Sequence, residues 1–350
     1  MAGPEATQPS PDLGHLEELR FGDMPTAEFR AAGHRLVEGI ADYLEHGETL
    51  PVLSQGEPGA LRASLPSAAP EHGEPIDAIL DDVDRVLAAG FTHWNQPGFF
   101  AYFSISASGP GILADFLSSA LNQQGMLWRT SPATTELEAV SLGWLRRLVG
   151  LPDSFEGVIY DTASVSTLHG LAAAREVHVP HVRELGLAGR PALPAYRIYC
   201  SEHAHSSVDK AVILLGFGHS TLVKVPADDQ YRMRVDALGS AIAEDRRAGR
   251  APMAVVATVG TTSSTSVDPV PAIAELCRRE RLWLHVDAAY AGVCAMVPGW
   301  EWIVEGVDQA DSVVLNPHKW LFTPFDLSAF YTRHLGSGLS QGGIVIQNDP

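Results

Sequence analysis

Short apolar runs alternate with segments of helical periodicity from residue 157 onward. Several of the runs are apolar throughout, which is typical of strands that are buried on both faces of a parallel sheet. We predict seven strands, at residues 157–160, 196–200, 220–225, 253–259, 282–286, 312–315 and 328–331. Helical spacing between them predicts helices at residues 165–178, 208–215, 235–248 and 270–280. This alternation predicts an α/β fold with a mostly parallel seven-stranded sheet covered by helices.

The N-terminal part of the chain has a different pattern. Residues 1–25 are rich in proline, glycine and acidic residues, a composition typical of partial disorder. Thr26 is a predicted N-cap, and an amphipathic helix is predicted after it. The apolar residues at helical spacing in this helix are Phe29, Leu36, Val37, Ile40 and Leu44. The Gly- and Pro-rich stretch 47–75 predicts an extended connector, and residues 76–89 predict a second helix.

The segment 93–103 is unusually aromatic. Its five aromatic residues are Trp94, Phe99, Phe100, Tyr102 and Phe103. Such a density favours a core or an interface over a substrate pocket, although aromatic side chains build both. After this segment, residues 111–123 predict a helix, and another is predicted to start near Ser131 and Pro132, because proline suits a first helical turn.

Composition and charge restrict the partners. The chain has 350 residues, of which 45% are hydrophobic and 19% charged, which is ordinary for a globular protein with one large domain and appended segments. Its formal net charge of −18 argues against nucleic acid or an anionic membrane as a partner. The three cysteines, Cys200, Cys277 and Cys294, are unclustered, which favours a reducing compartment. Since neither a secretory signal nor an apolar run of membrane-spanning length is visible, we expect a cytoplasmic protein.

Polar residues follow five of the predicted strands. The carboxyl ends of parallel strands share one edge of a sheet, so these residues can converge on one crevice. They are Asp161–Ser164, Ser201–Ser207, Gly260–Thr262, Asp287–Tyr290 and Asn316–Lys319. Hydroxyls at such positions are by default helix N-caps, but a helix N-terminus with free N–H groups is equally a phosphate site.

Other kinds of site are poorly supported. No glycine-rich nucleotide motif occurs at any of these junctions. His203 and His205 lack the further ligands that would complete a zinc set, so we expect no metal. Taken alone, His205 is more often a structural histidine than a functional one. Asp287 ends an apolar strand, where an unpaired carboxylate is costly, so it should meet a cation or a donor.

Lys319 follows the apolar run Val313–Leu315. A lysine becomes a nucleophile only when burial or neighbouring cations lower its pKa. His318 is adjacent, and Trp320 and Leu321 supply apolar cover. The alternative is a lysine at the start of a surface helix, and by itself the residue is as consistent with that as with chemistry.

Pyridoxal 5′-phosphate uses all of these groups together, because it needs a lysine, a carboxylate, a phosphate site and a flat group against its ring. Lys319 is the predicted Schiff-base residue, and Asp287 is predicted to keep the ring nitrogen protonated. His205 is predicted to stack on one face of the ring, while Ala289 is small enough to allow close approach on the other. The predicted phosphate ligands are Thr162, Ala163, Ser164 and Asn316, with His318 as a nearby donor.

Five segments resemble the group II pyridoxal-phosphate-dependent amino-acid decarboxylases, in particular the aromatic-L-amino-acid decarboxylase branch. The matching segments are Asn316–Trp320, His285–Tyr290, Ala204–Ser207, Ser131–Glu138 and residues 93–103. The resemblance covers roughly residues 25–335. It implies the aspartate-aminotransferase-like fold (fold type I) and a homodimer whose N-terminal segment crosses to the partner. It also implies that His205, Thr262, Asp287 and Lys319 are cofactor residues, and that Trp94, Phe103 and Ile105 lie at the substrate pocket.

The resemblance also frames the domain organisation. We expect residues 1–90 to form a helical segment that packs on the partner subunit, and residues 91–335 to form the large cofactor-binding domain. The family has a mobile loop with a tyrosine that protonates the substrate's Cα, and then a small C-terminal domain. Residues 336–350 are an atypical tail, in which we find no match to that tyrosine or to that domain. The phosphate turn departs as well, because relatives usually show a glycine and an acidic residue within the turn that is Asp161–Ser166 here.

Three functions therefore remain open at this level. The leading one is decarboxylation of an L-amino acid to its amine, with an aromatic substrate favoured by the aromatic segment. The second keeps the cofactor but yields an aldehyde, or transaminates. The third is a truncated, catalytically impaired chain that binds the cofactor or a full-length partner.

Overall fold

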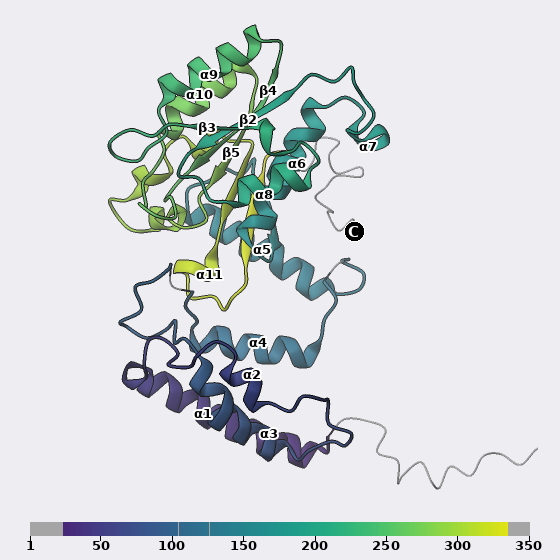
Figure 1. Cartoon of the computed structure of the whole chain (residues 1–350), viewed down its shortest axis with the longest axis vertical. Helices are drawn as coiled ribbons and strands as arrows, with labels where there is room; N and C mark the ends of the chain where they lie inside the picture. The colour runs from purple at the N-terminus through teal and green to yellow at the C-terminus, as the bar shows by residue number, and fades with distance from the viewer. Residues whose placement is uncertain (1–23, 104, 126, 335–350) are drawn as a thin grey trace, which may run out of the picture. The chain divides into compact units, whose positions relative to one another are not determined.

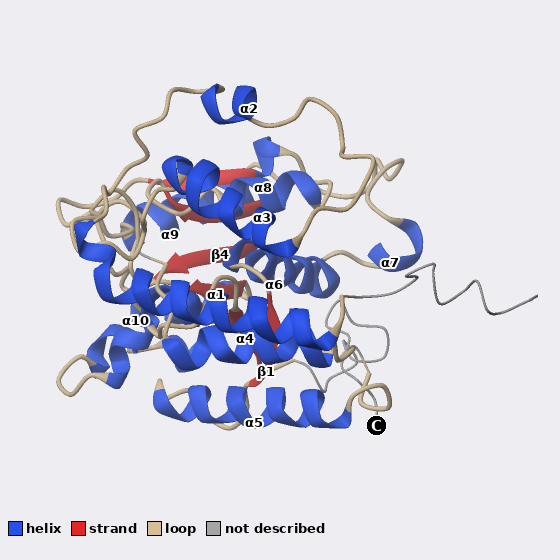
Figure 2. Cartoon of the chain, turned by 90° about the horizontal axis from the view of Figure 1, so that it is seen from below, coloured by secondary structure: helices blue, strands red, loops and turns tan. Residues whose placement is uncertain are grey.

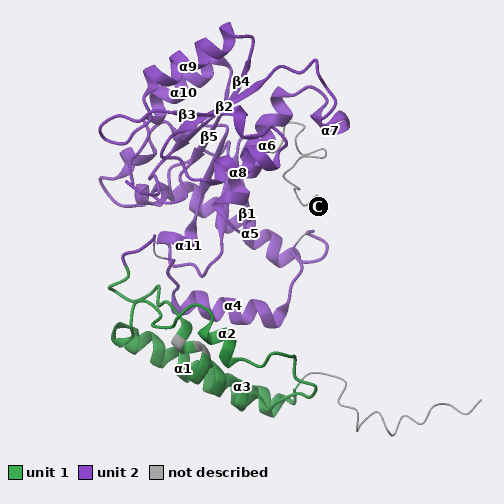
Figure 3. Ribbon diagram, viewed as in Figure 1, with its two compact units in different colours: residues 1–99 green, residues 100–350 purple. Residues whose placement is uncertain are grey.

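The computed structural model describes residues 24–334 apart from residues 104 and 126 (Figure 1). The expectations for residues 1–23 and for the 336–350 tail therefore lie outside the described residues. The chain divides into two compact units, residues 1–99 and 100–350 (Figure 3). None of the helices in the described part of the chain combines the length and the apolar character that crossing a bilayer requires.

The first unit is built from helices. Its α-helices are α1 (Thr26–His46), α2 (Ala60–Ser64) and α3 (Ile76–Asp82). A 3-10 turn, η2 (Gly47–Thr49), follows α1, while α3 continues into a π-helical turn, η3 (Val83–Leu87), and a 3-10 turn, η4 (Ala88–Gly90). Two predictions need correction. Pro25 rather than Thr26 holds the N-cap position of α1, because Thr26 already has helical geometry, and the predicted connector contains α2.

Unit 1 has a small interior. Only four of its described residues are buried, namely Ala32, Leu80, His93 and Phe99. The guanidinium of Arg35 on α1 donates to the carboxylates of Asp77 (3.2 Å) and Asp81 (2.5 Å) on α3. Exposed ion pairs of this kind contribute at most about 1 kcal/mol each. The helices of this unit thus leave much apolar surface uncovered, including Phe29, Leu36 and Leu44.

The second unit contains the seven-stranded sheet, in the order β1-β7-β6-β5-β4-β2-β3. The strands are β1 (Glu156–Tyr160), β2 (Tyr196–Ser201), β3 (Leu222–Val225), β4 (Ala251–Thr258), β5 (Trp283–Asp287), β6 (Ser312–Leu315) and β7 (Ser328–Thr332). Neighbouring strands are parallel except for β7, which is antiparallel to both β1 and β6. All seven predicted strands are present, although residues 219–221 form a 3-10 turn, η5 (His219–Thr221), so that β3 starts two residues later than predicted.

Helices cover both faces of this sheet. The α-helices of unit 2 are α4 (Gly109–Leu121), α5 (Pro132–Leu148), α6 (Ala163–His178), α7 (Val182–Leu185), α8 (Ser207–Leu214), α9 (Val235–Arg247), α10 (Val270–Glu280) and α11 (Pro317–Trp320). Three 3-10 turns, η6 (Gly292–Met296), η7 (Glu301–Val304) and η8 (Val307–Gln309), precede β6. Figure 2 shows the strands flanked by helices.

The core is divided by the sheet into two hydrophobic clusters. Successive side chains of a strand point to opposite faces, and β4 shows this directly. Val255 and Ala257 belong to the cluster that includes residues of α9 and α10, whereas Ala254 and Val256 belong to the cluster with α6 and α8. Because both faces are covered at the centre of the sheet, strands such as β4 and β6 are almost wholly apolar, which is the pattern that predicted them, whereas the edge strands β1 and β3 are partly exposed.

Local sequence explains several helix ends. Ser108 caps α4, since its side chain accepts the backbone N–H of Gly111 at 3.3 Å, and α4 therefore starts two residues before the predicted helix. Asn122, with φ 44°, ends α4 in the left-handed conformation that asparagine tolerates. Pro132 opens α5 as predicted. The single turn of α7 was not predicted, and nothing in its short sequence distinguishes it from a loop.

Candidate active site

A cavity of about 230 Å³ lies where the strand ends converge. Its lining comes from the ends of β1, β2, β4, β5 and β6 and the segments that follow them, from the loop before β7, and from Phe103 in the stretch before α4. The lining residues are Phe103, Thr162, Ala163, Ser164, His205, Thr258, Gly260, Thr262, Asp287, Ala289, Tyr290, Asn316, His318, Lys319 and Phe325. Every residue that the sequence suggested for cofactor binding is among them. In Figure 1, α11, which carries Lys319, lies at this end of the strands.

Lys319 differs from the other lysines of the chain. The sequence contains three, at positions 210, 224 and 319. Lys210 is exposed, and Lys224 forms an ion pair with Asp209 at 2.8 Å. Burial lowers the pKa of Lys319, an effect that the nearby carboxylate of Asp287 partly opposes. A larger fraction of its amine is therefore neutral and nucleophilic than in an exposed lysine.

Asp287 is the last residue of β5 and is only 6% exposed. One of its carboxylate oxygens accepts the backbone N–H of Ala289 at 3.2 Å. A buried carboxylate has capacity for further donors, so Asp287 is suited to hold a protonated group inside the cavity. Asp287 and Lys319 line the same cavity, as expected if one ligand contacts both the carboxylate and the amine.

His205 presents a neutral imidazole to the cavity. Its Nδ1 accepts the backbone N–H of Ser207 at 3.2 Å, so the proton of the neutral ring is on Nε2. Burial lowers the pKa of His205, and the positive charge of Lys319 adds to this effect, while Asp287 opposes it. The ring is therefore a flat, uncharged surface at neutral pH.

The N-terminus of α6 supplies backbone donors to the cavity. Thr162 is the N-cap, and its hydroxyl accepts the N–H of Val165 at 3.5 Å. The first-turn N–H groups of a helix have no partner within the helix, and the helix dipole favours an anion beside them. Ala163 and Ser164 are in this first turn and line the cavity. Asp161, whose charge would repel an anion, is exposed and is not among the lining residues.

Two buried polar atoms of the lining lack a partner. They are Oγ1 of Thr258 and Oδ1 of Asn316. A buried polar atom without a hydrogen bond costs about 1–3 kcal/mol, so such atoms in a cavity indicate a polar ligand. The donors at α6, the unsatisfied pair, the carboxylate and the amine together fit pyridoxal 5′-phosphate, which carries a phosphate, a ring nitrogen and an aldehyde.

The loop after β4 is held by a buried carboxylate. Asp268 accepts the backbone N–H groups of Met233 (2.7 Å) and Thr258 (2.8 Å), and burial raises its pKa to about 6. Gly260 in this loop has φ +89°, and a Cβ at this position would lie 2.6 Å from the Cβ of Ala291. The loop that carries Thr262 to the cavity therefore has a fixed path.

An aromatic wall lies next to the amine. Phe103 stacks on Tyr290 with a centroid distance of 3.7 Å and an interplanar angle of 13°. The amine of Lys319 is 5.7 Å from the Phe103 ring centroid. Of the predicted substrate residues, only Phe103 lines this cavity. Ile105 is half-buried but is not part of the described lining, and Trp94 belongs to unit 1, where it lines a different pocket.

Four lining residues had no role assigned from the sequence: Thr258, Gly260, Tyr290 and Phe325. Gly260 and Tyr290 lie within the segments that were expected to converge on the crevice. Thr258 lies at the end of a predicted strand, a position that could have identified it. Phe325 has no such signal, because the loop between α11 and β7 brings it to the cavity.

Comparison with known proteins identifies one family. The model described as the pyridoxal-dependent decarboxylase conserved domain matches residues 58–339. Among curated proteins, the chain is 41% identical over 324 residues to the aromatic-L-amino-acid decarboxylase of Bos taurus, covering 89% of this chain and 65% of that protein. It is 40% identical over 319 residues to the phenylacetaldehyde synthase of Arabidopsis thaliana, covering 89% and 64%. The chain thus spans less than two thirds of the length of these relatives.

The solved structures that this chain resembles include a tryptophan decarboxylase. A crystal structure of Oryza sativa TDC with PLP and tryptamine superposes with a TM-score of 0.84 at 35% identity, covering 90% of this chain and 68% of that one. A structure of Catharanthus roseus tryptophan decarboxylase in complex with L-tryptophan gives a TM-score of 0.84 at 36% identity, with coverage of 89% and 68%.

Proposed function

Because the chain belongs to the pyridoxal-dependent decarboxylase family, we propose that it binds pyridoxal 5′-phosphate at Lys319 and releases the carboxylate of an aromatic L-amino acid as carbon dioxide, leaving the amine. The observation that carries this proposal is the single cavity that Lys319, Asp287, His205 and the α6 N-terminus line together. The fold is that of the fold type I enzymes, to which the superposed structures belong.

Each group of the cavity has a proposed task. The bound cofactor supplies an electron sink for the electron pair that is left on the substrate's Cα. Lys319 attaches the cofactor through its amine, and Asp287 holds the proton on the ring nitrogen, since an anion stabilises the charged form. His205 offers its flat neutral ring to one face of the cofactor. Ala163 and Ser164 donate N–H groups to the phosphate.

The substrate class follows from the aromatic wall. Phe103, Tyr290 and Phe325 line the cavity and favour a flat apolar side chain. The solved relatives are named for tryptamine and L-tryptophan, which is consistent with that preference.

A second outcome keeps the same site but changes the product. The phenylacetaldehyde synthase of Arabidopsis thaliana is nearly as similar to this chain as the decarboxylases are. An aldehyde-forming reaction would consume dioxygen and water and release carbon dioxide, ammonia and hydrogen peroxide together with the aldehyde, whereas decarboxylation alone leaves the amine. A chain that binds the cofactor without turning over any amino acid is the third outcome. Product analysis separates the three.

The chain has three lysines, so a cofactor attached to one of them can be assigned by peptide mapping. The purified chain is incubated with pyridoxal 5′-phosphate, reduced with borohydride and mapped by peptide mass, which should place the cofactor on Lys319. Carbon dioxide release is then screened with Phe, Tyr, Trp, dihydroxyphenylalanine, Glu and diaminobutyrate. Lys319→Ala should abolish both the visible absorbance of the bound cofactor and carbon dioxide release. Lys210→Ala, at an exposed lysine, is the matched control and should retain both. Undiminished release from Lys319→Ala would refute the assignment.

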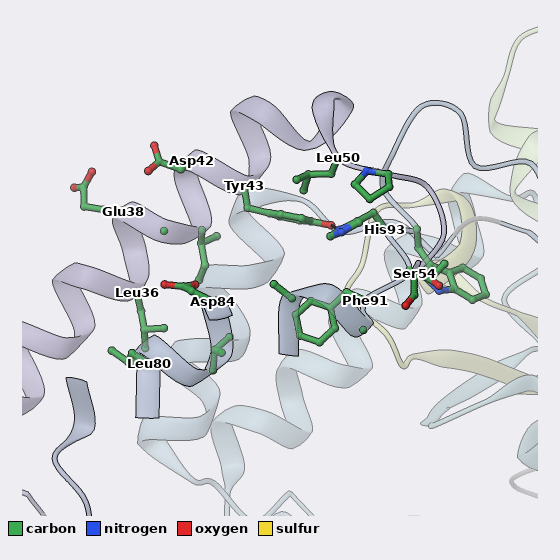
Figure 4. A pocket seen from close by; sticks show the side chains of 18 of the residues that line it. Leu36, Glu38, Asp42, Tyr43, Leu50, Ser54, Leu80, Asp84, Phe91 and His93 are labelled. Atoms are coloured by element: carbon green, nitrogen blue, oxygen red, sulfur yellow. Dashed lines mark hydrogen bonds between the residues drawn. The ribbon is translucent and has the colours of Figure 1, made fainter. Parts of the chain in front are cut away.

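We also propose that the chain forms a homodimer through unit 1. Unit 1 contains a pocket of about 1250 Å³ with apolar lining from residues such as Leu36, Leu50 and Phe91 (Figure 4). Figure 4 also shows Glu38 and Asp42 at this pocket. Unit 1 also exposes several large apolar side chains, among them Phe29, Leu44 and Phe91. Clustered exposed apolar side chains are typical of an interface, and a second subunit is the occupant that the resemblance implies.

Sedimentation analysis tests the dimer. Leu36→Asp places a charge in the pocket and should shift the chain to monomer. Leu185→Asp replaces a leucine on α7 that is 60% exposed, against 46% for Leu36, and should leave the mass unchanged. A monomeric unsubstituted chain, or equal behaviour of both variants, would contradict the proposed interface.

A reducing, cytoplasmic location is proposed as well, on the three buried cysteines, none of which is in a disulfide.

A further inference from the structure

His318 and Asn316 form a buried pair beside the reactive amine. Nδ1 of His318 lies 2.8 Å from the backbone nitrogen of Leu327, and its Nε2 lies 3.2 Å from Nδ2 of Asn316. The His318 side chain is 3% exposed, and Asn316 is 2% exposed. Both residues line the cavity.

The contact with Leu327 fixes the protonation of the imidazole. A backbone N–H can only donate, so Nδ1 of His318 must accept. Burial lowers the pKa of His318 to about 4, with a further contribution from the charge of Lys319, while Asp326 acts in the opposite direction. The ring is therefore neutral at physiological pH, and its one proton is on Nε2. This is a donor that points at the amide of Asn316.

The amide of Asn316 must then face the histidine with its oxygen. With Nδ2 toward Nε2–H, two donors would oppose each other at 3.2 Å, and Oδ1 would remain buried without a partner. A flip of the Asn316 amide fills the same volume and removes both the opposed donors and the unpaired oxygen, because Oδ1 then accepts the Nε2–H of His318. The amide N–H groups take the place of the unpartnered oxygen and require an acceptor there.

We propose that His318 is a positioning residue that orients the amide donors of Asn316 toward the phosphate of the cofactor. This inference rests on the proposed function for the identity of the ligand. It gives a partner to the nearby donor that was expected at His318, since the single proton of its ring is committed to Asn316. The hydrogen-bond chain runs from the N–H of Leu327 through the imidazole to the amide and ends on the phosphate. It thereby connects the start of β7 to the cofactor.

Two substitutions of His318 distinguish the effect of its hydrogen bonds from the effect of its size. The carbonyl of a glutamine can accept from Leu327 while its amide donates to Asn316, so His318→Gln preserves the chain of donors and acceptors. His318→Leu fills similar space and preserves neither contact. A third variant, Asn316→Asp, keeps an acceptor for Nε2–H but places a negative charge where the phosphate needs donors.

The experiment measures cofactor affinity rather than turnover. Dissociation constants are determined by absorbance titration for pyridoxal 5′-phosphate and for pyridoxal, which lacks the phosphate. Loss of a hydrogen bond to a charged group should weaken phosphate-ester binding by about 10- to 100-fold in His318→Leu, and by at least as much in Asn316→Asp. Pyridoxal binding should change less than about twofold in both. His318→Gln should bind the phosphate ester within about threefold of the unsubstituted chain.

An independent measurement checks the tautomer in the chain without cofactor. Long-range proton–nitrogen correlation of the His318 ring should show a proton on Nε2 and a lone pair on Nδ1. A proton on Nδ1, equal losses for both ligands in His318→Leu, or no loss in that variant would overturn the inference. Thermal unfolding of the chain without cofactor shows whether the leucine variant is folded, and if it is not, the glutamine and aspartate variants decide the outcome. If the unsubstituted chain bound no pyridoxal 5′-phosphate, the proposed function would fail, whereas the ring spectrum would still accept or reject the tautomer.

Discussion

Gly170 on α6 allows the helix to lie directly against β5, and replacing it by alanine should destabilise the fold. An added Cβ would lie 2.7 Å from Nδ1 of His285, 3.0 Å from its Cε1 and 3.1 Å from Oγ of Ser312. His285 and Ser312 are fully buried and hydrogen-bonded to each other at 2.8 Å. Neither side chain is the flexible end of an exposed residue, so the methyl group cannot be accommodated without displacing them.

Three effects set the magnitude. Overpacking of a buried site costs about 1–3 kcal/mol. Separating His285 from Ser312 leaves buried polar atoms unpaired, which costs a further ~1–3 kcal/mol. Alanine is the better helix former by about 1 kcal/mol, which acts in the opposite direction. The steric and hydrogen-bond effects prevail, and the free energy of unfolding should fall by roughly 3 kcal/mol.

Urea unfolding monitored by circular dichroism measures this difference. Gly143 provides the matched control, because it lies within α5 and a Cβ there would meet nothing within 4 Å. Gly143→Ala should therefore raise the free energy of unfolding by about 0.5–1 kcal/mol, through helix propensity alone. The two glycine-to-alanine changes should have opposite signs. A Gly170→Ala chain as stable as the unsubstituted one would refute the packing argument.

Three further substitutions address other buried groups. Burial raises the pKa of Asp268 from 3.8 to about 6, so the folded chain retains this proton longer than the unfolded chain does, and the contribution of the carboxyl group to stability falls as pH rises through this interval. Relative to Asp268→Asn, the free energy of unfolding of the unsubstituted chain should fall by up to about 3 kcal/mol between pH 4 and pH 6 in stepped urea titrations. A difference in unfolding free energy between the two chains that stays constant over this pH range would contradict the prediction. Tyr199→Phe removes the hydroxyl that donates to Asp245 at 2.7 Å and should lower the free energy of unfolding by about 1.5–3 kcal/mol in the same assay, whereas a change below 0.5 kcal/mol would show that this bond is dispensable. Gly260→Ala forces a side chain into positive φ and against Ala291, so it should lower both the melting temperature and the affinity for pyridoxal 5′-phosphate, and unchanged values would show that the loop adapts.

The centre of the sheet was predictable because the strands β4 to β7 are buried on both faces. Strands such as β4 then consist almost wholly of apolar residues, and no alternation with polar positions obscures them. The ends of elements were less predictable, since they depend on single interactions. The start of α4 is set by the side chain of Ser108, and that of β3 by the 3-10 turn before it.

The candidate site was predictable where it depends on sheet topology. Groups that follow parallel strands share one edge, so Lys319 and Asp287 were expected to lie near each other, and they line one cavity. Residues whose position depends on loops were harder to place. Phe325 reaches the cavity through the path of the loop before β7, while Ile105 follows an aromatic segment but is not part of the described lining. The orientation of Asn316 required the three-dimensional contacts of His318, which sequence spacing does not encode.

The neutral histidines have a consequence for how the site holds an anion. With His205 and His318 uncharged, the only formally charged side chains among the described lining residues are Lys319 and Asp287, one of each sign. The described lining contains no arginine, and on the proposed assignment the phosphate is met by the N–H dipoles of α6 and of the Asn316 amide. Dipoles act at short range and are shielded from mobile ions by burial, so added salt competes poorly with them. A chain with a strongly negative surface can thus retain a negatively charged ligand without a positively charged entrance.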